Sequence, residues 1–202
     1  YVNQSMLIGK SDPNINEYDT LLFASHSLID LVIPSFVKYI KSYALESCDS
    51  IAEVTFTEDS QLLSIGKNAF FFTEIEKIYI PGNVRVLEDG WCNGMGQLTN
   101  VLISPLNTNF CYLDDNKNII LGKSDLDNDE FDVLLFGSRD IEEVFIPPFI
   151  KHISFGAFTG CDYLKKITFS EDSQLQSIGK NAFRETQIVS ISIPSNVKLI
   201  KR

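Results

Sequence analysis

The chain has 202 residues, an apolar fraction of 44 % and a mean hydropathy of +0.02, values typical of a globular protein with one sizeable core. Its formal charge of −10 and isoelectric point near 4.6 disfavour nucleic acid and anionic lipid as partners, because both attract surfaces rich in Lys and Arg. No segment reaches the roughly 18 consecutive apolar residues of a membrane helix, so we expect no membrane insertion within this sequence.

The N-terminal segment, residues 1–27, is irregular. It starts at Tyr1 without the basic and apolar regions of a signal peptide, and the chain stops at Arg202 inside a repeated pattern. We therefore interpret the sequence as a piece of a longer protein. The triplet Asn3-Gln4-Ser5 matches the acceptor motif for an N-linked glycan, a motif that also arises often by chance.

A short repeat begins at residue 28. Its units are about 23 residues long, and each opens with the pattern apolar-x-x-apolar-x-apolar. The last three positions alternate, which indicates a short strand with one buried face. A following proline, as at Pro34 or Pro81, lacks the N–H of a ladder bond and should end the strand. The units open at Leu28, Ile51, Ile75, Leu98, Ile141, Leu164 and Ile188.

In the second half of a unit, an apolar residue such as Ile65 precedes a small-large pair such as Ala69-Phe70. This stretch is too short for a full helix. We expect turns, or a single helical turn, on the outer side of the stack.

A longer repeat contains these units. SQLLSIGKNAF at 60–70 recurs as SQLQSIGKNAF at 173–183, about 113 residues further on, and nearly half of the residues aligned at this offset are identical. A short unit cannot bury its apolar face alone, whereas stacked copies form a continuous core. Gly66 and Gly179 are predicted to relieve a tight bend. The side chains predicted to face inward are Leu62, Ile65, Phe70, Leu175, Ile178 and Phe183.

The combined pattern LxxIxIPxxVxxIGxxAFxxC resembles the BspA-like (Treponema pallidum type) leucine-rich repeats of bacterial and protist surface proteins, and the style of SEDSQLQSIGKNAF is similar to trichomonad members. The resemblance implies an α/β repeat solenoid, a right-handed superhelix with a parallel sheet on its concave side and turns and short helical turns on its convex side. Asn83 and Asn196 match the asparagine of the general leucine-rich pattern, whereas Phe36 and Phe149 replace it.

The same resemblance implies one solenoid over residues 1–202. The segments at about 1–27 and 104–140 then correspond to islands, in which two short hairpin-like strands replace regular rungs. A domain boundary at the second island is the alternative.

Catalytic groupings are not evident. His26 and His152 are aligned with Arg139 and Tyr39 in the other copy, which favours surface positions over a general base or metal ligand. The motifs GxSxG and HExxH, the P-loop and the Rossmann fingerprint are all missing from the sequence. We predict a non-catalytic protein without a cofactor; a carbohydrate-cleaving enzyme would need two carboxylates roughly 5 to 10 Å apart in a cleft.

The four cysteines, Cys48, Cys92, Cys111 and Cys161, form no CxxC pair. Cys48 and Cys161 occupy equivalent places five rungs apart, or about 24 Å at strand spacing, too far for a disulfide. We interpret all four as small buried hydrophobic residues. Unpaired thiols suit an intracellular protein better than an extracellular one.

Oxygen-bearing side chains alternate in the acidic stretches 12–19 and 125–132, as they do at the start of an EF-hand loop. The rest of that loop does not match, because Glu130 stands where glycine is required and Phe136 stands where the bidentate glutamate belongs. A solvated turn is the favoured interpretation, and calcium binding is the alternative.

The outward-facing strand positions form the candidate partner surface, since exposed aromatic and aliphatic side chains on a rigid sheet serve as anchors for a partner. Cross-strand packing is the competing explanation. The predicted outward stripe is Val32, Thr55, Tyr79, Leu102, Phe145, Thr168 and Ser192. The predicted partner-binding residues are Tyr79, Leu102, Phe145, Val32, Lys77 and Lys166.

We therefore expect a non-catalytic binding module of a cell-surface or secreted protein, which mediates adhesion to a host or neighbouring-cell protein or glycan through the concave sheet and the ridge loops. An intracellular leucine-rich-repeat scaffold for protein–protein interaction, located in the cytoplasm, is the alternative.

Overall fold

The computed structural model describes residues 5–201. By their contacts the residues divide into two compact units, Tyr1–Thr108 and Asn109–Arg202, and each unit is described by itself. That the whole chain forms one continuous solenoid stays a prediction, as do its right-handed winding and the concave position of its sheet. Asn3 of the predicted glycan acceptor lies outside the described residues.

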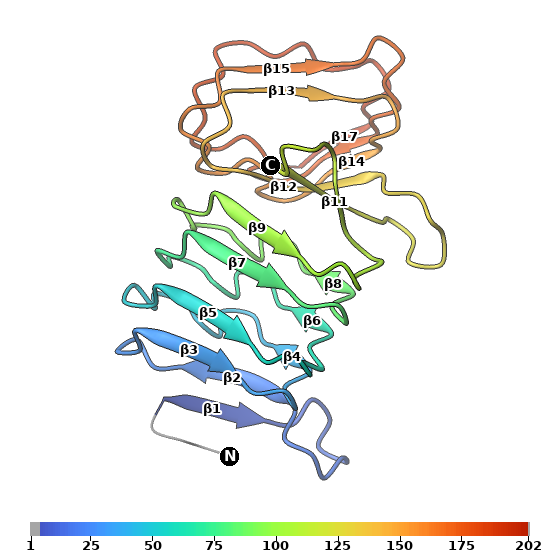
Figure 1. Ribbon diagram of the computed structural model, residues 1–202. Helices are drawn as coiled ribbons and strands as arrows, with labels where there is room; N and C mark the ends of the chain where they lie inside the picture. The colour runs from blue at the N-terminus through green and yellow to red at the C-terminus, as the bar shows by residue number, and fades with distance from the viewer. Residues whose placement is uncertain (1–4, 202) are drawn as a thin grey trace. The chain divides into compact units, whose positions relative to one another are not determined.

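The first unit contains a parallel four-stranded sheet that matches the predicted repeat (Figure 1). Within a strand, Leu31 and Ile33 are buried and Val32 between them is exposed, so the predicted alternation is confirmed. Two of the strands end directly before Pro34 and Pro81, as expected for a residue without an N–H. The strands are β3 (Asp30–Ile33), β5 (Glu53–Phe56), β7 (Lys77–Ile80) and β9 (Asn100–Ile103).

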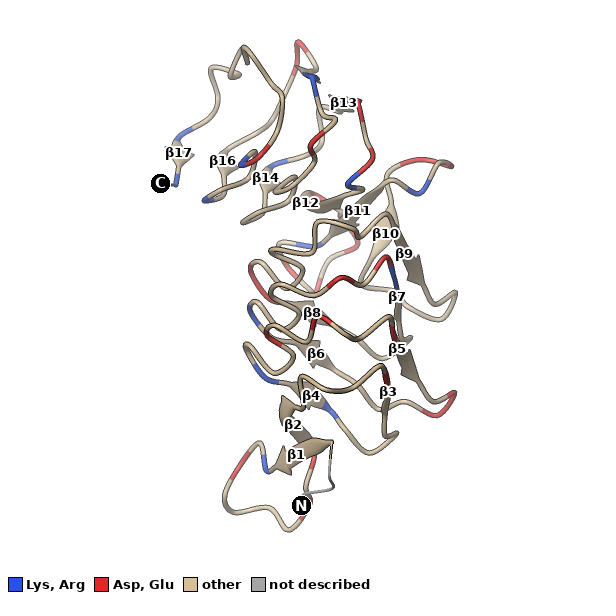
Figure 2. Ribbon diagram, turned by 90° about the vertical axis from the view of Figure 1, so that its left-hand side faces the viewer, with Lys and Arg blue, Asp and Glu red and all other residues tan. Residues whose placement is uncertain are grey.

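A second sheet in the first unit was not predicted (Figure 2). It consists of very short parallel strands, one in each rung, and each pairs through the apolar residue of the second half of the unit, such as Ile40 with Ile65. The strands are β2 (Thr20–Ala24), β4 (Tyr39–Ile40), β6 (Ser64–Ile65) and β8 (Val86–Leu87). An antiparallel strand, β1 (Met6–Gly9), pairs with β2, so the segment predicted as the first island contains a hairpin.

The second unit repeats this plan. In its first sheet, β13 (Glu143–Ile146) pairs in parallel with β15 (Lys166–Phe169). In its second sheet, three antiparallel strands of the predicted second island lead into short parallel ones. These strands are β10 (Cys111–Tyr112), β11 (Ile119–Gly122), β12 (Val133–Gly137), β14 (His152–Ile153), β16 (Ser177–Ile178) and β17 (Leu199–Ile200).

The predicted strand at 188–193 is not formed in the structure. Its outward positions carry Ser190 and Ser192, and serine lacks the β-branched or aromatic side chain that favours a strand.

No helix occurs within residues 5–201, so the predicted helical turns are wrong. At the outer corner of each rung, successive backbone amides donate alternately to a carbonyl of the same corner and to a carbonyl of the next rung. Ala44 N–H donates to Lys41 O within its own turn at 3.1 Å, and Leu45 N–H donates to Ala69 O of the next rung at 2.8 Å. A helix would need all these amides for bonds within one segment.

The corner also requires left-handed backbone at regular positions. In each complete corner these residues follow the inner apolar residue by three and by seven positions, and they have φ between 53° and 75°. Helical residues have negative φ, so no helix can pass through these corners. The residues are Tyr43, Ser47, Asn68, Phe72, Gly90, Gly94, Gly156, Gly160, Asn181 and Glu185.

Gly66 and Gly179 serve a different purpose from the predicted one. Neither has a positive φ, so relief of a tight bend is not their role. A Cβ at Gly66 would lie 2.5 Å from Ser42 N, and one at Gly179 would lie 2.5 Å from Phe155 N. These glycines are needed because the backbone of the preceding rung passes too close for any side chain.

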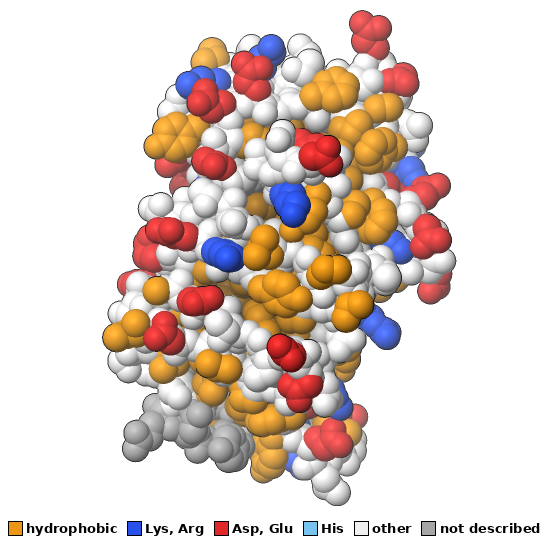
Figure 3. Space-filling model, viewed as in Figure 1, with side chains coloured by type: hydrophobic (Ala, Val, Ile, Leu, Met, Phe, Trp, Pro, Cys, Tyr) orange, Lys and Arg blue, Asp and Glu red, His pale blue; other side chains and the backbone are white. Residues whose placement is uncertain are grey.

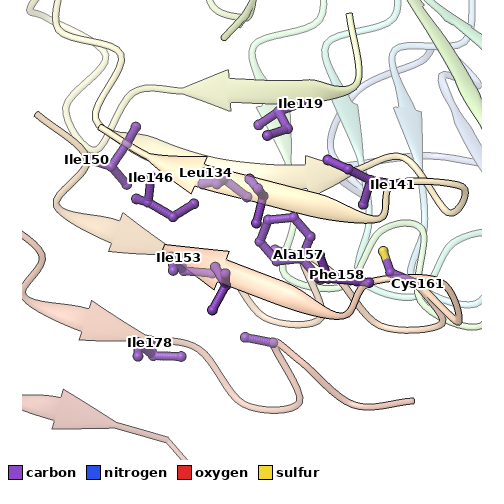
Figure 4. Packing of buried hydrophobic residues seen from close by; sticks show 14 of the residues in the cluster. Ile119, Leu134, Ile141, Ile146, Ile150, Ile153, Ala157, Phe158, Cys161 and Ile178 are labelled. Atoms are coloured by element: carbon purple, nitrogen blue, oxygen red, sulfur yellow. The ribbon is translucent and has the colours of Figure 1, made fainter. Parts of the chain in front are cut away.

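The core of each unit lies between its two sheets. Leu62, Ile65 and Phe70 have no exposed surface, which confirms their predicted inward orientation. In the second unit Leu175 and Ile178 are buried, and the half-buried Phe183 stacks on Phe158 with ring centroids 5.7 Å apart. Figure 4 shows this core, to which β11, β12 and the rungs that follow contribute apolar side chains.

Candidate functional site

The outward stripe of the first unit is a continuous ladder across four strands. The strand registers place Val32 beside Thr55 and Tyr79 beside Leu102, and the pairing of Val54 with Ile78 joins the two halves. Val32 is 55 % exposed and Tyr79 is 40 % exposed, while Thr55 and Leu102 are half-buried. We call Val32, Thr55, Tyr79 and Leu102 the sheet ladder. On the face in Figure 3, hydrophobic side chains lie among charged ones in this region.

Lys77, another predicted partner residue, is exposed at the edge of the ladder and lies beside Asn100 in the register. The remaining two predicted residues lie in the second unit. Phe145 is 56 % exposed beside Thr168, and Lys166 Nζ lies 3.6 Å from Glu143 Oε2. The prediction treated the six as one surface, but four belong to one unit and two to the other. Their role in partner binding stays a prediction.

The second unit contains a cavity that the sequence did not predict, with a volume of about 540 Å³. We call it the aromatic cavity. Strands β10 and β11 contribute to its wall, as do the end of the acidic turn before β12 and two loops of the following rungs. Its lining residues are Cys111, Tyr112, Leu113, Leu121, Glu130, Phe131, Asp132, Phe149, Lys151 and Gln174.

Three charged side chains of the aromatic cavity, Glu130, Asp132 and Lys151, are paired with one another, and we call them the charged group. The buried Asp132 accepts hydrogen bonds from Ser124 N–H at 2.9 Å and from Ser124 Oγ at 2.8 Å, and Lys151 Nζ lies 3.2 Å from its Oδ2. Lys151 also donates to Glu130 Oε2 at 2.7 Å. Burial alone would raise the pKa of Asp132, but these hydrogen bonds outweigh it and the pKa is lowered.

The two hydrogen bonds from Lys151 to Glu130 and Asp132 raise the pKa of the Lys151 ammonium. Asp132 and Lys151 are therefore both charged at neutral pH.

A second cavity, of about 420 Å³, adjoins the aromatic cavity because Leu113 and Phe149 line both. It brings in the predicted residue Phe145 together with polar side chains. Phe149, 46 % exposed, therefore lies where the two cavities meet. The sequence held one signal for this site, since Phe149 replaces the asparagine of the repeat pattern.

Where asparagine is present, it bonds to the preceding rung. Asn83 Nδ2 donates to Ser60 O at 2.8 Å and Asn196 Nδ2 donates to Ser173 O at 2.7 Å. Phenylalanine cannot make this bond, and the corresponding Phe36 and Phe149 have large exposed fractions instead.

The first unit carries a counterpart of the charged group. Lys38 Nζ lies 3.1 Å from Glu17 Oε2, and the buried Asp19 accepts from Ser11 N–H at 2.7 Å and from Ser11 Oγ at 2.6 Å. Tyr18 and Phe36 lie exposed at positions equivalent to Phe131 and Phe149.

The acidic stretches are turns organised by their own side chains. Asp12 Oδ1 accepts from Asn14 N–H at 2.8 Å, and Asp125 Oδ1 accepts from Asp127 N–H at 3.0 Å. Asn128 Oδ1 accepts from Glu130 N–H at 2.9 Å. Among residues 5–201, no group of three or more His, Cys, Asp or Glu side chains is placed to hold a metal ion. Whether these turns bind calcium stays a prediction to be tested.

The histidines occupy two different environments. His26 is exposed, as predicted, with its ring centroid 5.6 Å from that of Phe23. His152 is half-buried, and its Nδ1 lies 2.9 Å from Ser177 Oγ on the next rung. Arg139, the counterpart of His26, is buried and donates to Gly137 O at 3.1 Å, so equivalent positions do not share one environment.

All four cysteines are thiols. Cys48, Cys92 and Cys161 are buried, which confirms the prediction that they act as small core residues. Burial raises the pKa of the Cys48 thiol to about 11. Cys111 differs, because it is half-buried and lines the aromatic cavity.

No helix among the described residues is long and apolar enough to cross a membrane.

Solved structures with a similar fold are leucine-rich-repeat proteins from bacteria. The chain is 24 % identical to the pneumococcal vaccine antigen PcpA, with a TM-score of 0.73 over 84 % of this chain and 40 % of that one. It is 21 % identical to a leucine-rich repeat protein from Eubacterium ventriosum, with a TM-score of 0.69 over 86 % of this chain and 50 % of that one.

A leucine-rich repeat protein from Bacteroides ovatus is 16 % identical, with a TM-score of 0.52 over 99 % of this chain and 61 % of that one. The chain thus spans about half or less of the first two structures. A search of curated proteins found no match. The model of the BspA type leucine rich repeat region matches residues 14–116 and 129–202. The chain therefore belongs to the family of BspA-type leucine-rich-repeat proteins.

Proposed function

We propose that this chain is a non-catalytic binding module of a cell-surface protein and that it holds a partner protein or glycan through the outer face of its first sheet. Membership of a leucine-rich-repeat family supports a repeat module for protein interaction, because such families typically serve as binding scaffolds without catalysis. The observation that carries the proposal is the sheet ladder, in which Val32 on β3 and Tyr79 on β7 are exposed, with β5 between them.

The physical reason is the cost of leaving apolar side chains in water. A side chain such as Tyr79 gains little stability for the folded unit while it is exposed, but it contributes strongly when a partner covers it. Strand β7, which carries Tyr79, is paired with a strand on each side, so this anchor is held in place and a partner does not have to order it on binding. The acidic Asp30 and Glu53 beside the ladder favour a partner surface that is basic or neutral.

The test measures binding of the chain to host or neighbouring cells. The variant Tyr79→Ser with Leu102→Ser removes the two ladder side chains on β7 and β9, and we expect at least a tenfold loss of binding with a nearly unchanged melting curve. Val86→Ser is the matched control, because Val86 is 40 % exposed in a strand of the other sheet. Equal binding by the double variant and the wild type would refute the ladder as the partner surface.

The four thiols favour a second candidate, an intracellular scaffold, since secreted proteins usually pair their cysteines. Labelling of intact cells with an antibody against this chain separates the two candidates. We expect labelling without permeabilisation; labelling that requires permeabilised cells would support the scaffold.

A further inference from the structure

The two adjoining cavities of the second unit, which together we call the groove, are distinct from the sheet ladder. Leu113 and Phe149 line both cavities, whereas Gln174 lines the first and Phe145 the second. Aromatic rings are distributed along the groove: Tyr112 and Phe131 in the first cavity, Phe149 at the junction and Phe145 in the second. A volume of several hundred Å³ with a few convergent polar groups is typical of small-ligand sites.

An anionic ligand is disfavoured by the charges of the lining. It contains four carboxylates and a single ammonium, that of Lys151, which is already paired with two of them. Three further lysines nearby, Lys117, Lys123 and Lys166, are each already placed against a ring or a carboxylate. The carboxylates that line the groove are Glu130, Asp132, Asp114 and Glu143, and they would oppose phosphate, sulfate or a carboxylated sugar.

A cationic ligand is disfavoured for a different reason. Two rings of the first cavity already carry a lysine: Lys123 Nζ lies 5.1 Å from the centroid of Phe131, and Lys117 Nζ lies 5.5 Å from that of Tyr112. A cationic ligand would bind more weakly to a ring that already has a lysine over its face, because the positive charges of the ligand and the lysine repel each other.

A neutral ligand must then satisfy both the rings and the polar groups. Carboxylates such as Glu130 accept hydrogen bonds, while Lys151 and the amide of Gln174 donate them. A pyranose ring matches this combination, because it presents C–H groups on one face and hydroxyls, which both donate and accept, around its edge. Phe149, with 46 % of its surface exposed where the cavities meet, is the platform against which such a face would pack.

We propose that this groove of the second unit is a saccharide-binding site that takes neutral hexopyranose units of a glycan chain, with Phe149 as its central platform. Binding at this site does not depend on the sheet ladder.

The test uses isothermal titration calorimetry of the full chain with neutral oligosaccharides of six units, namely malto-, cello-, laminari- and chito-hexaose. A sulfated heparin hexasaccharide and a hexalysine peptide serve as the charged probes. We expect at least one neutral hexaose to bind at millimolar concentration or below and Phe149→Ala to weaken it at least tenfold.

The control is Phe36→Ala, since Phe36 is the counterpart of Phe149 in the first unit and is similarly exposed, at 43 %. We expect this variant to bind as the wild type does. The double variant Tyr79→Ser with Leu102→Ser should also bind the hexaose normally, which keeps this test separate from that of the partner surface.

The proposal is overturned if no neutral hexaose binds at millimolar concentration, if heparin or hexalysine binds more tightly, or if Phe36→Ala weakens binding as much as Phe149→Ala. Because Phe149 is half exposed, its truncation should leave the melting temperature nearly unchanged. A melting temperature that falls sharply calls for Phe149→Tyr, which keeps the ring face: retained binding supports the proposal and lost binding overturns it.

Discussion

The two units carry the same side chains in different surroundings. The Glu, Asp, Phe, Lys and Gln that line the aromatic cavity in the second unit recur in the first as Glu17, Asp19, Phe36, Lys38 and Gln61. In the second unit these five side chains share the lining of the aromatic cavity with Cys111 and Tyr112 of β10 and with Leu113. The comparison teaches that the repeat supplies the charged and aromatic side chains of this cavity, whereas the rest of its wall comes from the island.

Core packing is expected to show the largest difference between the units. Phe70 is fully buried in the first unit, and its counterpart Phe183 is half-buried in the second. Phe70→Ala should lower the free energy of unfolding by about 3 to 5 kcal/mol, because a buried ring leaves a cavity. Phe183→Ala should cost clearly less. Urea denaturation of both variants measures the difference, and equal losses would contradict this account of the last rungs.

The inter-rung glycines should behave alike in both units. A methyl group at Gly66 or Gly179 would meet the backbone of the preceding rung at 2.5 Å, so Gly66→Ala and Gly179→Ala should each cost about 1 to 3 kcal/mol. Gly96→Ala is the matched control, since a Cβ there meets nothing within 4 Å. Thermal melting compares the three variants. If Gly66→Ala left the melting temperature unchanged, the rungs could move apart at little cost in free energy.

The buried aspartates should give both units the same dependence on pH. Their folded-state pKa values are lowered, so the stability that they contribute is present above the unfolded pKa of about 4 and is lost as the pH falls through the folded value. Asp19→Ala and Asp132→Ala should each cost roughly 1 to 2 kcal/mol at neutral pH, because the Ser11 and Ser124 amides lose their acceptors.

Both variants should also flatten the acid limb of a stability profile measured between pH 3 and 7. If the stability of Asp132→Ala fell as steeply with decreasing pH as that of the wild type, a group other than Asp132 would cause the loss of stability in acid.

The smallest effect on stability is expected at the paired lysines, where the two units differ. Lys38 pairs with Glu17 alone, whereas Lys151 pairs with both Glu130 and the buried Asp132. Lys151→Gln should therefore lower the melting temperature more than Lys38→Gln, since it leaves a buried carboxylate without its counter-charge. Scanning calorimetry at low and high salt measures the two melting temperatures. An equal fall for both variants, or a larger fall for Lys38→Gln, would contradict the expected difference between the two lysines.

Several features were predictable because they repeat. The alternation of Leu31, Val32 and Ile33 predicts a strand with one buried face, and Pro34 predicts its end. The inward positions of Leu62, Ile65 and Phe70 follow from equal packing in equal rungs. Other features were missed since they depend on contacts between rungs, such as the second sheet and the left-handed corners at Tyr43 and Ser47.

The candidate sites divide in the same way. The outward orientation of Tyr79 and Phe145 could be predicted from the strand period alone. The groove could not, because it joins Tyr112, Phe131, Phe149 and Gln174 from four separate segments that no periodicity relates. Phe149 could be recognised in the sequence because it replaces the asparagine of the repeat pattern. Its part in a binding site, however, depends on the island residues that line the cavities with it.

By itself the sequence determined the repeat length, the strand positions and the inward-facing side chains, because burial of a regular apolar pattern admits few arrangements. The tertiary structure alone decided how the corners turn and where a cavity opens. The corners and the cavity depend on the backbone spacing between neighbouring rungs and on the placement of an inserted strand. The repeat period of the sequence determines neither the spacing nor the placement.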